Sequence, residues 1–165
     1  MSTFAENYGP WALVTGASSG IGEAFARQLA ELGLNLFLVA RREERLNNLA
    51  TELEQTNQVH VLSVPLDLTK DNFLKTLDEK IGDKQIGLLV NNAGIGSVGL
   101  YTNNEPEREA QMVKLHCLAP TILTHHFAPK MLERKKGGII FLGSIFSYQP
   151  MPYVSTYSAS KVFNT

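Results

Sequence analysis

The sequence has few of the features that mark secreted, metal-binding or membrane proteins. Its 165 residues include one cysteine, Cys117, which excludes an intrachain disulfide and a cysteine-rich zinc site. No apolar run is long enough to cross a bilayer, and the polar N-terminus lacks the plan of a signal peptide. The net charge of -1 argues against a generally basic nucleic-acid-binding surface. We therefore expect a cytoplasmic protein with no metal site and no nucleic-acid or membrane partner.

Short apolar runs alternate with amphipathic stretches along the whole chain. The apolar runs predict strands at residues 11–15, 36–40, 59–65, 86–90 and 139–144. A helix is expected after each strand; the longest runs from Pro106 to about Arg134, and the last starts at about Tyr153. Such alternation predicts an α/β fold with a doubly wound parallel sheet covered on both faces. Without a linker or repeat, residues 1–165 are expected to form one domain.

A glycine-rich turn joins the first expected strand to the first expected helix. Residues 15–22 read Thr-Gly-Ala-Ser-Ser-Gly-Ile-Gly. Glycines allow a tight turn and a close approach of an anion to the helix N-terminus, and serine hydroxyls add donors. An ordinary glycine turn is the alternative, but three glycines at this place favour a phosphate-binding turn. The candidate residues are Gly16, Ser18, Ser19, Gly20, Ile21 and Gly22.

Four motifs in register resemble those of the short-chain dehydrogenase/reductase family, from about Trp11 to the end of the chain. They are the glycine turn, the Asn-Asn-Ala-Gly at 91–94 after the fourth strand, Ser144 at the end of the fifth, and the Tyr-Ser-Ala-Ser-Lys at 157–161. The resemblance implies a Rossmann-like, single-domain oxidoreductase that binds a nicotinamide cofactor. It also implies cofactor contacts at Asn92, Ala93 and Gly94.

Tyr157 and Lys161 are four residues apart, so they share one face of a helix. A free phenol has a pKa of about 10, and a neighbouring ammonium lowers it, which makes tyrosine usable as a general acid/base for an alcohol–carbonyl pair. Ser144 is expected to hydrogen-bond the same substrate oxygen. The resemblance implies that Lys161 also binds the nicotinamide ribose. Alone, the Tyr-x3-Lys pattern is usually an exposed helix face.

His116 departs from the family pattern. The family usually has an asparagine at this place in the fourth helix, where it completes a catalytic tetrad. Pro120 has no N–H, so the carbonyl of residue 116 is expected to lack its helical partner. In the family that carbonyl holds a water of a proton relay, and His116 would keep this backbone role. The alternative is a neutral histidine packed beside Cys117.

The end of the second strand bears on the choice of nicotinamide. An NAD enzyme of this kind places a carboxylate there, whereas this chain reads Val-Ala-Arg-Arg at 39–42. Arg41 suits the 2′-phosphate of NADP, although a basic helix start is the alternative. We expect NADP rather than NAD. Asp67 and Leu68 match positions that contact the adenine in the family.

These observations predict hydride transfer between NADP(H) and a small carbonyl or alcohol substrate. One rival is a nucleotide-sugar epimerase or dehydratase, which shares Tyr-x3-Lys but usually has a Gly-x2-Gly-x2-Gly turn. The other is a truncated cofactor-binding remnant with weak or no turnover. The chain ends four residues after Lys161, whereas the family continues, so we expect the N-terminal part of a longer enzyme or a truncated product. The strand at 139–142 is then an open edge that invites aggregation or dimerisation, and the family's usual helix pairing also makes a homodimer one expectation.

Overall fold

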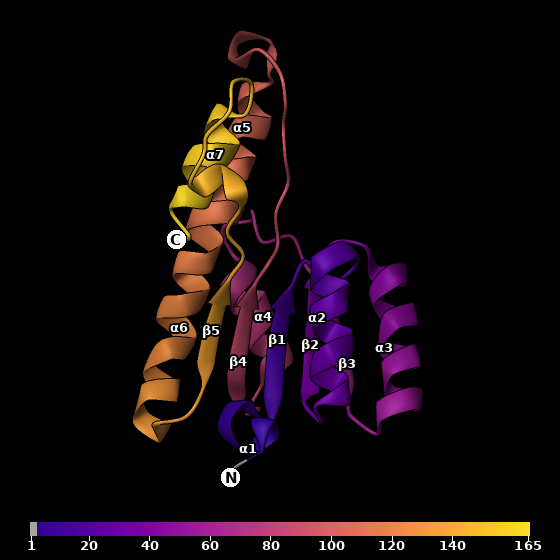
Figure 1. Ribbon diagram of the computed structural model, residues 1–165. Helices are drawn as coiled ribbons and strands as arrows, with labels where there is room; N and C mark the ends of the chain where they lie inside the picture. The colour runs from indigo at the N-terminus through magenta and orange to yellow at the C-terminus, as the bar shows by residue number, and fades with distance from the viewer. Residues whose placement is uncertain (1–2) are drawn as a thin grey trace.

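Parallel strands covered by helices form the centre of the computed structural model, which describes residues 3–165 (Figure 1). In these residues the sheet has five strands in the order β3-β2-β1-β4-β5. The strands are β1 (Trp11–Thr15), β2 (Asn35–Ala40), β3 (Val61–Pro65), β4 (Ile86–Asn91) and β5 (Gly138–Phe141). The helices are α1 (Phe4–Tyr8), α2 (Gly20–Glu31), α3 (Glu43–Asn57), α4 (Phe73–Ile81), α5 (Pro106–Val113), α6 (Ala119–Arg134) and α7 (Ser155–Val162). The predicted doubly wound sheet is confirmed; Met1 and Ser2 of the expected domain lie outside the described residues.

Two apolar layers hold the helices onto the sheet. Ala12 and Val14 of β1 pack with α2 and α3 on one face. Trp11 and Leu13 of the same strand pack with α4 and α6 on the other face. Strands β1 and β4 are buried at every position, as continuous apolar runs predict. The edge strands β3 and β5 are partly exposed because each has a neighbour on one side only.

Some expected boundaries were wrong by two or three residues. Strand β3 begins at Val61 rather than residue 59, and β5 ends at Phe141 rather than Ser144. Beyond β5, the Leu142 carbonyl accepts a hydrogen bond from the Lys161 side chain. Helix α7 begins at Ser155 because Tyr153 has a φ of 70°, which a right-handed helix does not allow.

The long helix expected at 106–134 is interrupted by a π-helical turn at Lys114–Leu118. The Ala119 N–H donates to the Lys114 carbonyl, five residues back. Pro120 has no N–H to donate to His116, as the sequence predicts. The His116 carbonyl instead accepts a hydrogen bond of 3.0 Å from Nδ2 of Asn164. The turn thereby ties the residues just after α7 to the long helix.

The short helix α1 was not expected from the sequence. Its start has a capping box, in which the Thr3 side chain accepts from the Glu6 N–H and the Glu6 carboxylate accepts from the Thr3 N–H. Ala5 and Tyr8 pack against the core on the α2 and α3 side of the sheet.

The segments that follow β4 and β5 extend beyond the carboxyl ends of the strands. In Figure 1, α5 and α7 lie side by side there, and the two helices are in contact. This end of a parallel sheet is where open α/β folds bind ligands.

Candidate active site

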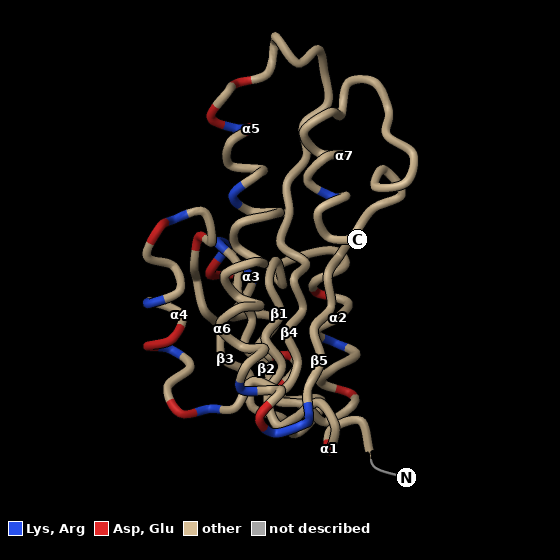
Figure 2. Tube along the Cα trace, turned by 90° about the vertical axis from the view of Figure 1, so that its left-hand side faces the viewer, with Lys and Arg blue, Asp and Glu red and all other residues tan. Residues whose placement is uncertain are grey.

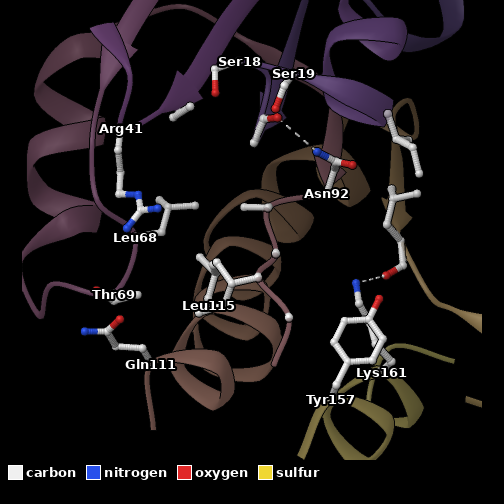
Figure 3. Close-up of a pocket in the computed structure, with 18 of the residues that line it drawn as sticks. Ser18, Ser19, Arg41, Leu68, Thr69, Asn92, Gln111, Leu115, Tyr157 and Lys161 are labelled. Atoms are coloured by element: carbon white, nitrogen blue, oxygen red, sulfur yellow. Dashed lines mark hydrogen bonds between the residues drawn. The ribbon is translucent and has the colours of Figure 1, made fainter. Parts of the chain in front are cut away.

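A cavity of about 780 Å³ opens at the carboxyl ends of the strands. Figure 3 shows that Arg41, Leu68 and Thr69 lie on one side of it and Tyr157 and Lys161 on the other, with Ser18, Ser19 and Asn92 along the upper edge. The volume lies within the usual range for ligand sites, which is about 300–1,000 Å³. The lining includes these predicted site residues: Gly16, Ser18, Ser19, Ile21, Arg41, Asp67, Leu68, Asn92, Ala93, Gly94, Tyr157 and Lys161.

The glycine turn and the Asn92 side chain interlock. Nδ2 of Asn92 donates to the Thr15 carbonyl over 2.8 Å. Gly16 has a φ of 69°, and a Cβ there would lie 2.8 Å from Nδ2 of Asn92. A Cβ on Gly22 would collide with the same Nδ2 and with the Gly16 carbonyl. Gly22 therefore supports the turn from behind; neither it nor Gly20 is among the described residues that line the cavity.

Thr15 has a structural role beside the cavity that the sequence did not reveal. Its buried Oγ1 accepts from the N–H groups of Asn92 and Ala93 at 2.9 and 3.0 Å, and it donates to the Val90 carbonyl. The first strand is thus fixed to the segment that follows β4. The Thr-Gly pair at the start of the turn was the available signal.

Two arginines stand beside the glycine turn. Arg41 lines the cavity, as expected. Nη2 of Arg42 donates to the hydroxyls of Ser18 and Ser19 at 2.9 and 2.6 Å. The sequence reasoning missed this contact because it assigned the anion to Arg41 alone. Together they place two cations next to a helix N-terminus, an arrangement that favours phosphate groups.

Asp67 also lines the cavity, near Arg41. Partial burial of the carboxyl raises its pKa. Hydrogen bonds from the Thr69 N–H and hydroxyl, together with the charge of Arg41, lower the pKa by more than burial raises it, so the net pKa is below its usual value. Asp67 is therefore an ionised hydrogen-bond acceptor at this end of the cavity.

Tyr157 and Lys161 lie on one face of α7, with Nζ of Lys161 5.9 Å from the centre of the tyrosine ring. Lys161 is buried, and its Nζ donates to the Leu142 carbonyl over 2.7 Å. Burial lowers the pKa of Lys161, against a smaller opposing effect of Cys117. The pair is therefore not the exposed helix face that the bare pattern usually indicates.

Ser144 was expected to close the fifth strand, but it lies beyond the end of β5 at Phe141. It is not among the described residues that line the cavity, although Gly143 and Phe146 are. Its Oγ accepts from the Phe146 N–H at 3.2 Å and caps the 3-10 turn Ile145–Ser147. The expected contact of Ser144 with a substrate oxygen stays a prediction.

His116 bridges two segments with its two ring nitrogens. The Ile95 N–H donates to Nε2 over 3.0 Å, so Nε2 carries no proton. Nδ1 then holds the proton and donates to Oγ of Ser160 over 2.8 Å, and this hydroxyl donates to the Tyr157 carbonyl. Burial and, less strongly, the charge of Lys161 lower the pKa of His116 to about 4. The histidine is therefore neutral at physiological pH.

The end of the cavity around α7 is poor in charge. Residues 137–165 contain one charged side chain, Lys161, which is the blue segment of α7 in Figure 2, and residues 86–104 contain none. Apolar side chains from both segments line this end: Ile95, Val98, Phe146 and Val154. This half of the cavity suits an uncharged molecule.

The structure holds no helix between residues 3 and 165 that is long and apolar enough to cross a membrane. Within the same residues there is also no cluster of three or more His, Cys, Asp or Glu side chains that would suit a metal ion.

Comparison with known proteins identifies close similarity to short-chain dehydrogenases. The family model described as short chain dehydrogenase matches residues 10–165. The chain is 38% identical over 160 residues to a very-long-chain 3-oxoacyl-CoA reductase from Pyricularia oryzae, covering 94% of this chain and 48% of that protein. It is 33% identical over 161 residues to the human inactive hydroxysteroid dehydrogenase-like protein 1, covering 96% of this chain and 49% of that protein. The chain thus spans about half the length of these curated relatives.

A solved structure has the same fold. A short-chain dehydrogenase from Sphingobium yanoikuyae in complex with NADPH is 35% identical and superposes with a TM-score of 0.88, covering 94% of this chain and 61% of that chain.

Proposed function

Because this chain belongs to the short-chain dehydrogenase/reductase family, we propose that it transfers a hydride between NADP(H) and a carbonyl or alcohol substrate. The observation that carries this proposal is the placement of Tyr157 and the buried Lys161 at one end of a cavity that has Arg41 at its other end. The arginine end suits a phosphate, and the tyrosine end suits proton transfer.

The residues present fit an NADP cofactor. The interlocked glycine turn leaves backbone N–H groups and the Ser18 and Ser19 hydroxyls at the start of α2, where a pyrophosphate would bind. Arg41 and Arg42 would hold the 2′-phosphate, and Asp67 and Leu68 the adenine. Binding of NADPH to the Sphingobium yanoikuyae relative supports this choice.

Bound NADPH would supply the hydride to the carbonyl carbon. Tyr157 would donate its phenolic proton to the carbonyl oxygen, and the reverse reaction would return it. Lys161 would stabilise the phenolate through its charge and bind the nicotinamide ribose. Ser144 would hydrogen-bond the substrate oxygen through its O–H, since its contact with Phe146 uses the oxygen as acceptor.

The substrate we propose is an uncharged ketone or its alcohol. The segments that line the tyrosine end of the cavity carry apolar side chains and, apart from Lys161, no charge. The Pyricularia oryzae relative is named as a very-long-chain 3-oxoacyl-CoA reductase; in such a substrate the 3-oxo group on the acyl chain is a ketone, and the charge is on the CoA part.

Tyr157→Phe tests the proposal because it keeps the ring and removes the hydroxyl. Ketone-dependent oxidation of NADPH should fall by about 10² or more, the scale of a lost acid/base group, while the Kd for NADPH stays within about twofold. Tyr148→Phe is the matched control, since that side chain is 79% exposed. Near-normal turnover of Tyr157→Phe would refute the assignment.

The alternative is a cofactor-binding protein without turnover. Two observations favour it: the similarity to an inactive human relative and the histidine at the place of the family's usual asparagine. NADPH fluorescence separates the two functions. An enhancement on binding that a panel of ketones fails to remove would indicate binding without turnover, whereas its loss on adding a ketone would indicate a reductase.

A further inference from the structure

We propose that His116 and Glu109 are paired positioning residues that fasten the loop after β4 to the catalytic helix α7. Each of the two side chains is buried, and each contacts both the loop at 92–104 and helix α7. Only the expected effect on turnover rests on the proposed function. Hydrogen exchange and NMR test the bridges themselves without any assay of activity.

The first bridge runs through the imidazole of His116. Its Nε2 accepts from the Ile95 N–H in the loop, and its Nδ1–H donates to Ser160 in α7. The geometry requires one neutral tautomer, because a proton on Nε2 would face the Ile95 N–H. The ring also packs edge-on against Tyr157, with 5.6 Å between the ring centres.

The second bridge runs through the carboxylate of Glu109, seven residues earlier. Oε1 accepts from the Ser97 hydroxyl at 2.6 Å and from Nδ2 of Asn104 at 3.0 Å, both in the loop. The Thr156 side chain in α7 also lies close enough to this carboxylate to lower its pKa. Ser97 and then Thr156 lower the pKa of Glu109, so a charge that is costly to bury is kept ionised by its partners.

The loop needs such fastening because of its composition. Residues 92–104 include three glycines, Gly94, Gly96 and Gly99, and glycine has the largest conformational freedom to lose. Residues Ala93 to Val98 line the cavity. Without the bridges, this wall would move relative to α7.

The two bridges meet α7 beside the residues that matter for the reaction. Thr156 immediately precedes Tyr157, and Ser160 immediately precedes Lys161. The His116 ring also packs closely against the backbone of Gly94, since a Cβ there would lie 3.0 Å from Nε2 of His116. The bridges therefore set the distance between the wall of the cavity and the acid/base pair.

Three substitutions of His116 separate the two ends of its bridge. The amide of an asparagine would lie where Nδ1 lies, and the amide of a glutamine would lie where Nε2 lies. Leucine has no polar atom at either place. Hydrogen exchange of the Ile95 amide should be about tenfold faster in His116→Asn and His116→Leu, and near the wild-type rate in His116→Gln. His125→Gln, an exposed histidine of α6, is the control. The bridge would be overturned if the Ile95 amide exchanged at the same rate in all variants. It would also be overturned if His116→Asn and His116→Gln accelerated this exchange equally.

Nitrogen-15 NMR of the imidazoles reads the tautomer directly. The signal lost in His116→Asn should show a protonated Nδ1 and an unprotonated Nε2, unchanged from pH 8 to pH 5. A protonated Nε2, or titration near pH 6.5, would refute the assignment.

Glu109 is tested with Glu109→Ala, for which Glu107→Ala is the control because Glu107 is exposed on the same helix. We expect kcat to fall about tenfold or more, since small misplacements of catalytic groups are costly, while the Kd for NADPH changes less than about threefold. Hydrogen exchange of the Ser97 amide should become faster in Glu109→Ala than in the wild type. If no ketone is turned over by the wild type, the proposed function fails, but the exchange and NMR results still decide the bridges. Unchanged exchange and kcat in Glu109→Ala would overturn the second bridge.

Discussion

Arg41 and Arg42 are neighbours in the sequence but differ in what they contact. The Arg42 guanidinium is held by the Ser18 and Ser19 hydroxyls, so its charge is fixed beside the glycine turn. Both arginines line the cavity, and Arg41 lies near Asp67, whose ionised form it favours. A 2′-phosphate in the proposed NADP site would therefore have two cations beside it, Arg42 held at the serine hydroxyls and Arg41 near Asp67.

Arg41→Asp should weaken NADPH binding at least tenfold and change NADH binding much less. The substitution removes an attractive charge and adds one that repels the 2′-phosphate, while a carboxylate suits the ribose hydroxyls of NADH. Fluorescence titration with each cofactor measures both Kd values. Arg45→Asp, on the exposed side of α3, controls for net charge. If the Kd values for NADPH and NADH changed by the same factor, Arg41 would act only as a surface charge and would not recognise the 2′-phosphate.

Among the elements, the turn between β1 and α2 depends on close contact rather than on its sequence alone. Gly22→Ala places a methyl group against the Asn92 side chain and the Gly16 carbonyl. Although alanine favours a helix, we expect the free energy of unfolding to drop by about 1–3 kcal/mol, because the backbone must shift. Gly96→Ala is the control, since no atom lies within 4 Å of a Cβ there. Equal urea midpoints for the two variants would contradict the interlock.

The sequence predicts the elements whose signal is local and misses those that depend on distant partners. The runs around Leu13 and Leu89 are apolar except for the last residue of each strand, Thr15 and Asn91, and both strands were found. Nothing local shows that Tyr153 adopts a left-handed φ or that the Leu142 carbonyl turns to Lys161, so the ends of α7 and β5 were misplaced. Pro120 did predict the broken helical bond of His116.

In the candidate site, too, some residues could be predicted from local sequence motifs and others only from contacts with distant residues. Its glycines, Tyr157 and Lys161 stand in motifs with a fixed spacing, and spacing is read from sequence alone. Arg42 and Glu109 gain their roles from partners 24 and 12 residues away, Ser18 and Ser97. A single exposed-looking Glu in an acidic helix start gives no sign that it is buried.

At the scale of the whole molecule, the buried ionisable groups of residues 3–165 lie in the segments that follow β4 and in α7. Lys161, Glu109 and His116 are each at most 7% exposed, and they belong to α7, α5 and the π-helical turn that follows α5. Burying such groups costs free energy unless each is hydrogen-bonded. The site therefore makes the stability of the whole fold depend on pH.

His116 should make the protein less stable as the pH falls from 7 to 5. Its pKa is about 4 when folded, against 6.5 for a free histidine, so in this range the unfolded chain binds the extra proton. Around it, the Lys161 charge opposes protonation, and neither the Tyr157 ring nor the neighbouring Cys117 offers a negative partner. The unfolding free energy should drop by about 2 kcal/mol between pH 7 and pH 5. Urea unfolding measures it, and His116→Asn should remove most of the decline, since the lowered pKa of Glu109 acts mainly below this range. The same slope in both proteins would mean that His116 titrates normally and that the bridge to Ile95 does not hold it neutral.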